Sequence, residues 1–388
     1  MPFQKLSHVD LDVLIVGGGI AGLWLLDDLR RAGYDALLVE STALGNGQTL
    51  AAQGFLHSGL KYALAGRPGT FVDALIRMPN VWRDALAGCS EPDLRDVFLR
   101  GGFCYCWRED SFMGRLGLLG ARIGLQVPLE VVPRDQRPEF MSSCPGMLYR
   151  IEEQVVDPAS LLAVLAERNQ ERIVLGTVTR DAGCVVVTDP TGERSLTGQP
   201  RTIVLAAGEG NEALRELFGL SNNGVMRRLP LRFLTLTGDL PLLNGFCLSG
   251  AKAKVIITSQ RSCPDEVVWQ VASETVGTAG GCPLEEFESR VMAELKESLP
   301  WFQLPECAIR LNVVTRAEAA TPDDSRAADI KILQEGNILT AWPTKLVLAP
   351  RLTEQVRLLL SKPSGSARVI PAVAQWQRPS VAGYPWTK

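Results

Sequence analysis

Residues 12–40 read DVLIVGGGIAGLWLLDDLRRAGYDALLVE, and the order of elements in this stretch predicts the fold. The apolar run Val13–Val16 is short and β-branched, as in a buried parallel strand. A glycine-rich turn and an apolar helical stripe follow it, and the helix is expected to end at Gly33. A second apolar strand, Ala36–Val39, then ends on Glu40. Strand, turn, helix and strand in this order indicate a βαβ unit of a parallel sheet.

The glycines of the turn are spaced as G-x-G-x-x-G, and each has a physical role. Gly17 permits the tight turn, Gly19 lets a pyrophosphate contact the backbone, and Gly22 lets the helix lie close to the strand. The start of the helix offers N–H groups and a positive dipole to phosphates. Glu40 follows the second strand, where a carboxylate would accept hydrogen bonds from a ribose diol. The stretch therefore predicts a dinucleotide site.

Composition narrows the class of protein. The chain has 388 residues, 46% hydrophobic and 21% charged, with a net charge of −3. This predicts two lobes, or one α/β body with an insert, and gives no reason to expect nucleic acid as a partner. No apolar stretch is long enough for an integral membrane segment, and no signal peptide precedes the first strand. The nine cysteines lack CxxC spacing, which suits reduced thiols and a cytoplasmic location.

Two other kinds of site are disfavoured by the sequence. No cluster of cysteine and histidine has metal-ligand spacing, so we expect no metal. No G-x-S-x-G element is present, which argues against a serine hydrolase.

Residues 41–66 are rich in glycine and other small residues and carry almost no charge before Lys61. A surface loop is usually more polar, and a connection between helix and strand is usually much shorter. A stretch of this kind suits backbone that lies against a large flat ligand. We therefore expect it to pass beside the cofactor.

The run GQTLAAQGFLHSGLKY, residues 47–62, together with the glycine spacing, resembles the flavoproteins of the D-amino acid oxidase superfamily. Within it, the H-x-G-L-x-Y element resembles the glycerol-3-phosphate dehydrogenase and 2-hydroxyglutarate dehydrogenase branches. The resemblance implies FAD, with this run along the diphosphate and isoalloxazine. The residues expected to bind FAD are Gly17, Gly19, Ile20, Ala21, Gly22, Glu40, Ser41, Gly47, Gln48, Thr49, Gln53, Gly54, Val178, Ala207, Gly208 and Lys345.

Further elements are predicted along the chain. Asp157 caps a helix that starts at Pro158. The other predicted elements are helices at 70–91, 115–125 and 285–299, strands at 96–107, 172–180, 184–188, 202–205 and 309–315, a turn at 191–198, antiparallel strands within 224–271, and a strand, turn and helix at 337–360. The strand that ends in Ala206-Ala207-Gly208 resembles a second FAD contact of such flavoproteins. The residues before Asp12 form a polar tail that leads straight into the first strand. The tail beyond Ser361 is rich in proline, serine and polar residues and is expected to be loosely ordered.

These elements predict an α/β fold. The resemblance implies that the fold combines a Rossmann-like FAD-binding domain with an antiparallel-sheet α+β substrate domain. The FAD-binding domain would be of the glutathione-reductase type, as in two-dinucleotide-binding-domain flavoproteins. The FAD domain is expected to be discontinuous, comprising 1–75, 150–222 and 330–388. The substrate domain is expected to comprise 76–149 and 223–329.

Three residues are the main candidates for chemistry. His57, one of only two histidines, suits a base or substrate ligand beside the flavin. A covalent link to FAD and a purely structural hydrogen bond are the alternatives for it. Lys345, in an apolar stretch, suits the N1–C2 oxygen edge of the flavin, or else extends its ammonium to the surface. Arg316 suits a substrate carboxylate, or else pairs internally with Glu318 or Asp323.

Weaker candidates stand nearby. Lys61 and Tyr62 follow His57 within one turn, and Arg232 lies among apolar neighbours. A solvated lysine, a core tyrosine and an internally paired arginine are the alternatives.

The resemblance implies an FAD-dependent oxidoreductase that oxidises a C–H bond next to an amine or hydroxyl of a small, carboxylate-bearing substrate. Hydride passes to flavin N5, and oxygen, a quinone or another carrier reoxidises the flavin. Alternatives are a flavin monooxygenase or halogenase on the same fold, and a dinucleotide-binding protein without catalysis.

Overall fold

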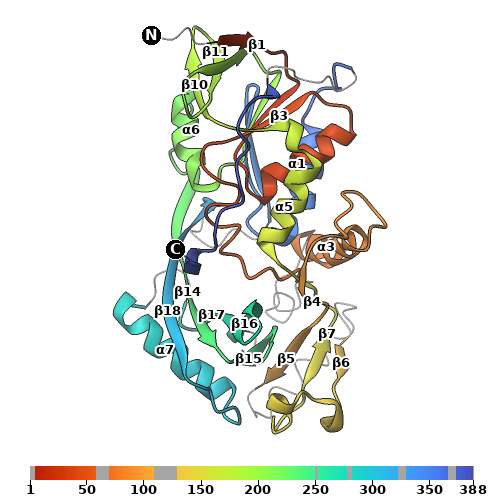
Figure 1. Cartoon of the computed structure of the whole chain (residues 1–388), viewed down its shortest axis with the longest axis vertical. Coiled ribbons are helices and arrows are strands. Elements are labelled where there is room, and N and C mark those ends of the chain that lie inside the picture. Colours follow the sequence, from red (N-terminus) through yellow and green to blue (C-terminus); the bar gives the residue numbers. More distant parts are fainter. Residues whose placement is uncertain are drawn as a thin grey trace.

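A computed structural model of the chain describes residues 5–57, 70–108, 129–249, 252–277, 282–321, 329–365 and 373–387. Figure 1 shows two lobes, with a parallel sheet and its helices in the upper one and a large antiparallel sheet in the lower one. The predicted helix at 115–125 lies outside the described residues, as do Lys61 and Tyr62.

The parallel sheet forms around the stretch that predicted it. Its six strands, in spatial order, are β19 (Lys331–Glu335), β20 (Ile338–Trp342), β13 (Thr202–Leu205), β2 (Val13–Val16), β3 (Ala36–Glu40) and β9 (Ile173–Leu175). All neighbours are parallel except β19, which is antiparallel to β20 at the edge. Because both faces are covered, β2 and the first four residues of β3 are apolar rather than alternating.

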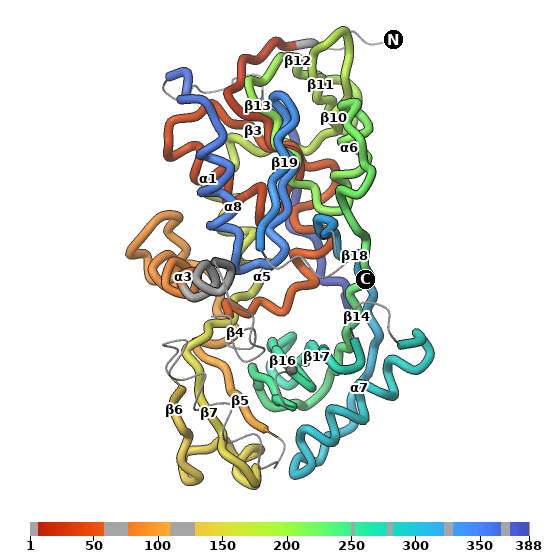
Figure 2. The backbone as a smooth tube through the Cα atoms, turned by 180° about the vertical axis from the view of Figure 1, so that it is seen from behind, coloured from red at the N-terminus to blue at the C-terminus, as the bar shows by residue number. Residues whose placement is uncertain are grey.

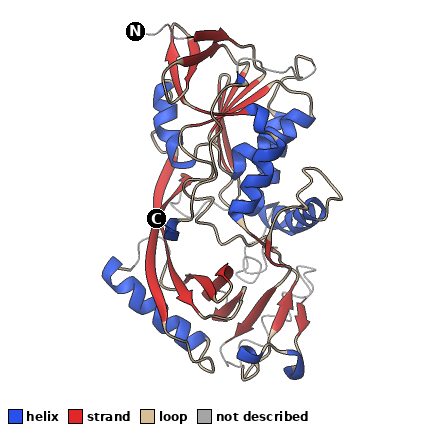
Figure 3. Ribbon diagram, in the orientation of Figure 1, coloured by secondary structure: helices blue, strands red, loops and turns tan. Residues whose placement is uncertain are grey.

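Helices cover one face of this sheet. They are α1 (Ile20–Arg31), α5 (Pro158–Arg168) and α8 (Ala349–Leu358). Val13 and Ile15 of β2 pack against these helices, whereas Leu14 and Val16 point to the opposite face, as the two-residue period of a strand requires. Figure 3 shows the helices gathered on this side.

A four-stranded sheet covers the other face. Its order is β1 (Lys5–His8), β12 (Arg194–Gly198), β11 (Cys184–Thr188) and β10 (Thr177–Asp181). Val185, Val187 and Leu196 from this sheet share a core with Leu14 and Val16.

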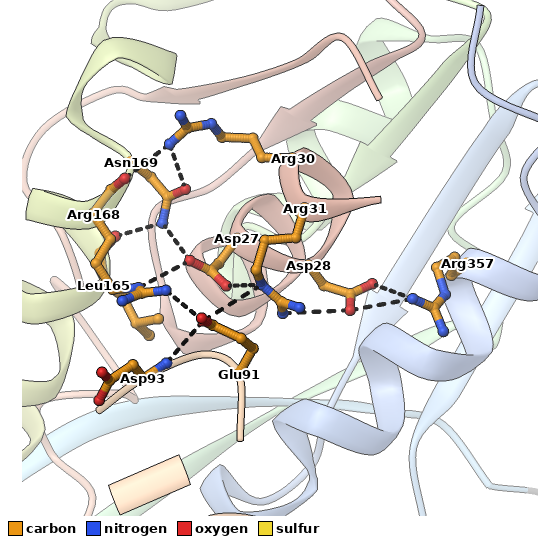
Figure 4. Close-up of polar contacts among 10 residues, drawn as sticks. All are labelled: Asp27, Asp28, Arg30, Arg31, Glu91, Asp93, Leu165, Arg168, Asn169 and Arg357. Atoms are coloured by element: carbon orange, nitrogen blue, oxygen red, sulfur yellow. Dashed lines mark hydrogen bonds and ion pairs between the residues drawn. The ribbon is translucent and has the colours of Figure 1, made fainter. Parts of the chain in front are cut away.

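A polar cluster fixes the C-terminal end of α1 (Figure 4). Asp27 accepts hydrogen bonds from Arg31 Nε at 2.7 Å, Arg168 Nε at 3.2 Å and Asn169 Nδ2 at 3.2 Å. Asp28 pairs with Arg357 of α8 at 3.3 Å. These contacts tie α1 to α5 and α8, so the first helix is held at both its apolar face and its end.

The lower lobe is built on an eight-stranded sheet. In spatial order its strands are β18 (Cys307–Ala319), β14 (Met226–Gly238), β17 (Glu266–Ala272), β16 (Lys252–Cys263), β15 (Gly245–Ser249), β5 (Cys104–Arg108), β7 (Tyr149–Ile151) and β6 (Leu129–Val131). All neighbours are antiparallel except β15 and β5, which are parallel. Helix α7 (Leu284–Ser298) packs through Phe287, Val291 and Leu295 on one face.

The remaining elements lie between the lobes or beside the upper one. They are α3 (Thr70–Leu86), the strand pair β4 (Leu99–Gly101) and β8 (Val155–Val156), and α6 (Asn211–Leu217). The long strands β14 and β18 pair from Met226↔Ala319 to Gly238↔Cys307. Figure 2 shows them side by side along one side of the molecule, running from the upper lobe into the lower one.

Several local expectations were wrong because tertiary pairing overrides short-range pattern. Arg194–Gly198, predicted as part of a turn, is strand β12, and the polar start pairs with it as β1. The predicted strand 172–180 is divided at Gly176 into β9 and β10, which belong to different sheets. The strand predicted at 96–107 with a glycine interruption is interrupted after Gly101, as expected, but its two parts, β4 and β5, belong to different sheets. The short strand β15 was not predicted.

The tail beyond Ser361 is more ordered than expected where it is described. Trp376 is buried against the upper core, and Val381 forms a bridge with Leu44. Tyr384 donates to Asp157 Oδ2 at 2.6 Å. These aromatic and hydrogen-bonding contacts are long-range, so composition did not indicate them. None of the helices in the described ranges has the length and apolarity needed to cross a bilayer.

Candidate functional site

Two adjoining cavities lie where the lobes meet. The first, which we call the turn cavity, has a volume of about 500 Å³ and lies at the carboxyl ends of β2, β3 and β13. The second, which we call the sheet cavity, has a volume of about 210 Å³ and lies between residues 48–57 and the eight-stranded sheet. Residues shared by both linings are Gln48, Ala52, Thr344, Lys345 and Leu346. The two cavities are therefore neighbours that meet at these residues.

The glycine turn is shaped by close backbone contacts. Gly17 has φ +117°, and a Cβ there would lie 2.6 Å from the carbonyl oxygen of Ala206. A Cβ on Gly22 would overlap the carbonyl oxygen of Gly17. Any side chain at either position would push α1 or β13 away from β2. The turn can thus keep its shape only with glycine.

The start of α1 opens towards the turn cavity. Its cap residue is Gly19, which has no side chain that could cap the helix, and the first turn contains no acidic residue. Ile20 N donates to Thr49 Oγ1 at 3.3 Å, which places residues 45–49 across the helix start. A helix N-terminus of this kind favours an anion.

Glu40 lies on the lining of the turn cavity and is held by backbone amides. Its Oε2 accepts from Gly18 N at 2.7 Å, and its Oε1 accepts from Thr42 N at 2.9 Å. The hydroxyls of Thr42 and Ser41 also donate to Oε1, at 3.2 and 3.5 Å, whereas among the described residues Oε2 accepts from Gly18 N alone. Oε2 therefore has a lone pair that could still accept from a sugar hydroxyl.

The structure brings most of the predicted cofactor residues together. Those on the turn-cavity lining are Gly17, Gly19, Ile20, Ala21, Glu40, Ser41, Gly47, Gln48, Thr49, Val178, Ala207, Gly208 and Lys345. Gly22 packs beneath the turn and is absent from the lining. Gln53 and Gly54 line the sheet cavity instead. Gly18, Thr42 and Trp342 also line the turn cavity and were not predicted.

A family model described as FAD dependent oxidoreductase (DAO) matches residues 12–238, from β2 to the end of β14. The chain belongs to this family. Its members are FAD-dependent oxidoreductases, and this confirms the family, fold class and cofactor expected from the glycine spacing and residues 47–62.

Similar proteins support the assignment. A probable FAD-dependent oxidoreductase of Pseudomonas aeruginosa is 32% identical over 388 residues, covering 97% of each chain. The crystal structure of an FAD-dependent oxidoreductase from that organism matches with a TM-score of 0.80 at 30% identity, covering 98% of each chain. Glycine oxidase from Geobacillus kaustophilus has a TM-score of 0.65 at 16% identity, covering 94% of this chain and 98% of its own, which shows the shared fold.

The turn cavity fits FAD in its chemistry. Glycine backbone and an uncapped helix start suit the diphosphate, and Glu40 suits the adenosine ribose. The small residues Ala206 and Ala207 on the lining would let the chain pass close to a bound ligand. FAD, when bound, supplies the acceptor for a hydride.

A strained turn joins the two cavities. Thr344 has φ +60°, an unusual conformation for a β-branched residue, and Lys345 N donates to Pro343 O at 2.7 Å. Thr344 Oγ1 is buried and makes no hydrogen bond within the described ranges. Backbone strain of this kind concentrates at functional sites. A turn at the Trp-Pro pair was predicted, but its strained backbone was not.

The sheet cavity contains the three catalytic candidates. His57, Arg316 and Lys345 all line it, and Arg316 and Lys345 are only 4% and 8% exposed. The surface alternative for Lys345 is therefore disfavoured. Glu153, a buried carboxylate that the sequence analysis did not select, also lines the cavity.

Arg316 also makes the internal pair that was its alternative role. Its Nε lies 2.8 Å from Glu318 Oε1, and Glu318 is fully buried. The pair fixes one edge of the guanidinium, while the residue still lines the cavity. Arg232 instead donates to Cys282 O at 2.5 Å and is not part of either lining.

The rest of the sheet cavity is mostly apolar. Its wall includes Phe55, Leu231, Phe233, Phe246 and Ile256. Gln270 stands among these residues and was also missed by the sequence analysis. A signal for it exists, because it is the only polar residue between Val267 and Ala272 of β17.

Proposed function

We propose that this FAD-dependent oxidoreductase oxidises a C–H bond next to an amine or hydroxyl of a small, carboxylate-bearing substrate held in the sheet cavity. Hydride would pass to flavin N5. The observation that carries the proposal is the shared lining of the two cavities at Gln48, Thr344 and Lys345. A flavin whose diphosphate lies at the glycine turn would present its reactive ring at this junction.

Each candidate residue has a role in this proposal. Arg316 would bind the substrate carboxylate, because a buried guanidinium recognises a carboxylate through paired N–H groups. His57 would take the proton of the amine or hydroxyl as hydride leaves. Lys345, on both linings, would stabilise negative charge on the reduced flavin. The apolar wall would exclude water and hold the substrate's carbon skeleton.

The direct test is anaerobic mixing of the purified holoprotein with a panel of amino and hydroxy acids, followed by flavin absorbance. Bleaching by some of these acids supports the proposal. A flavin that no member of the panel reduces, although dithionite reduces it, overturns the proposal. Reoxidation of the reduced protein by oxygen or by a quinone analogue then identifies the class of acceptor.

Variants assign the residues. Arg316→Lys keeps the charge but loses the paired N–H groups, so the substrate concentration for half-maximal reduction should rise about tenfold or more. Arg290→Lys, on the exposed face of α7, is the matched control and should leave the substrate concentration for half-maximal reduction unchanged.

His57→Ala should slow flavin reduction at least about 100-fold while FAD stays bound. An unchanged rate would remove His57 from the reaction. Acid precipitation tests its alternative role, because flavin that remains wholly in the supernatant excludes a covalent link.

A further inference from the structure

Gln270 is placed by its strand to face the sheet cavity. Its neighbours in β17, Trp269 and Val271, point into the core beneath α7, so the alternation of the strand turns Gln270 to the opposite face. The side chain is 2% exposed. A polar side chain this buried normally has all its hydrogen-bonding groups satisfied.

The orientation of the Gln270 amide is fixed by chemistry. Its Nε2 donates to Ala51 O at 2.7 Å, and a carbonyl oxygen can only accept, so the amide cannot be turned round. The other atom, Oε1, is therefore an acceptor. It is buried and accepts no hydrogen bond from any residue that the structure describes. A buried acceptor without a donor costs free energy, and a ligand with a donor would remove that cost.

Gln53 adds a second amide of the same polarity. Its Nε2 donates to the backbone carbonyls Ile256 O at 3.2 Å and Gln270 O at 3.1 Å. Its Oε1 accepts no hydrogen bond within the described part of the chain, and the residue lines the same cavity. Both glutamines thus line the cavity, have their nitrogen engaged by the protein, and have an oxygen to which no described residue donates.

The charged groups of the lining have a matching arrangement. Arg316 and Lys345 are cations that can only donate, whereas Glu153 is a buried carboxylate. The cavity thus combines donors for an anionic group with several acceptors for a group that carries hydrogens. An ammonium or secondary amine can donate two hydrogen bonds or more, whereas a hydroxyl donates one.

We propose that Gln270, together with Gln53, determines specificity by accepting hydrogen bonds from an amino group of the substrate. This inference rests on the proposed function and narrows it, since it separates amines from alcohols. A hydroxyl in the same place would leave one of the two amide oxygens without a donor. An alcohol has one donor hydrogen fewer than the corresponding amine. A site with two hydrogen-bond acceptors therefore discriminates against the alcohol more strongly than an apolar site does.

Binding of ligands that cannot be oxidised tests the inference. The probes are C2-methylated amino acids and the matching C2-methylated hydroxy acids, with side chains from methyl to benzyl, titrated against the holoprotein. Neither kind has a hydrogen on C2, so perturbation of the flavin spectrum reports binding alone. The expected result is that the amino member of a pair binds at least about tenfold more tightly, which corresponds to about 1.4 kcal/mol.

Variants separate specificity from structure. Gln270→Met keeps the length of the side chain and removes the acceptor. The ratio of the Kd of the hydroxy acid to the Kd of the matching amino acid should therefore fall towards one. Gln270→Glu keeps acceptor oxygens but loses the donor to Ala51, so the preference should persist. Gln334→Met, on exposed β19, is the matched control and should bind as the unaltered protein does.

The outcomes distinguish the two proposals. If neither series perturbs the flavin, the proposed carboxylate substrate is wrong, and the inference falls with it. If both series bind equally, or if Gln270→Met keeps the full preference, only the inference about Gln270 is wrong. If Gln270→Met and Gln270→Glu weaken both series by the same factor, Gln270 merely positions Ala51.

Discussion

At the scale of single residues, absent side chains matter as much as present ones. Gly17 and Gly22 are required because backbone atoms occupy the places where their Cβ atoms would stand. Thr344 shows the opposite case, a β-branched residue kept in a conformation that favours glycine. Both kinds of residue stand beside the turn cavity, where backbone geometry determines what can bind.

Gly22→Ala should weaken FAD binding at least about tenfold and destabilise the fold by about 1–3 kcal/mol, because the added methyl would overlap Gly17 O. Flavin fluorescence during titration of the apoprotein measures the affinity. Gly102→Ala is the control, since nothing lies within 4 Å of its Cβ and it should change stability by about 0.5 kcal/mol or less. Equal FAD affinity in both variants would contradict the role given to Gly22.

At the scale of elements, α1 is held by more than its apolar stripe. Leu23, Leu26 and Leu29 pack into the upper core, and Asp27 lies on the remaining face, where it receives three hydrogen bonds from Arg31, Arg168 and Asn169. Burial alone does not define the position of a helix along its axis. The polar cluster does this, and so it fixes where the start of α1 lies at the turn cavity.

Asp27→Asn should lower the free energy of unfolding by about 2–3 kcal/mol, because two arginines lose a buried carboxylate partner. Urea denaturation of the holoprotein measures it. Arg290→Ala removes an exposed ion pair with Glu286 and should cost about 0.5 kcal/mol or less. Comparable losses in the two variants would show that the cluster in Figure 4 contributes no more than a surface pair.

At the scale of the whole molecule, distant parts of the chain meet at the amino ends of the parallel strands. Asp12, just before β2, accepts from Asp35 N at 3.0 Å and from Arg201 Nη1 at 2.9 Å. It also accepts from Ser364 N at 3.2 Å, in the C-terminal segment. Burial by itself would raise the pKa of Asp12, but these hydrogen bonds outweigh it and the pKa lies below its ordinary value.

This pKa has a consequence for acid stability. Because the folded pKa is below the unfolded one, ionised Asp12 stabilises the fold above about pH 4, and this contribution is lost as the pH falls through the folded pKa. Asp12→Asn should therefore be less stable by about 1–3 kcal/mol at pH 7 and show a smaller loss of stability below pH 4. Thermal unfolding across pH 3–7 measures both. Parallel pH curves for the two proteins would refute the assignment.

The cofactor should stabilise the molecule because its cavity is built from the start, middle and end of the chain. Removing FAD should lower Tm, and adding it back at 100 times Kd should restore about 2.7 kcal/mol. FMN lacks the adenylate that the Glu40 region would bind, so it should restore much less. If FMN restored the stability as fully as FAD does, the region of the glycine turn and Glu40 would not bind the adenylate part of FAD.

Much of the fold could be predicted from local signals. The glycine spacing with its flanking strands predicted β2, α1 and β3, because a tight turn needs glycine at fixed positions and a buried strand needs a short apolar run. The Asp157 cap and the long antiparallel strands also had clear marks, and the structure has α5, β14, β16, β17 and β18 there. No local sequence signal predicted β1, β12 or the ordered part of the tail, because their partners lie far away in the chain.

The sequence by itself determined that the chain binds a dinucleotide, because binding of two phosphates needs glycines at fixed spacing, and spacing is local information. The family and FAD followed from the resemblance of residues 47–62, which is also a local signal. Only the tertiary structure decided what forms the sheet cavity. His57, Arg316, Gln270 and Lys345 come from four separate segments, and Gln53 and Gly54 proved to line this cavity rather than the turn cavity. The physical reason is that a substrate site depends on which side chains converge, and convergence is set by strand pairing between distant segments.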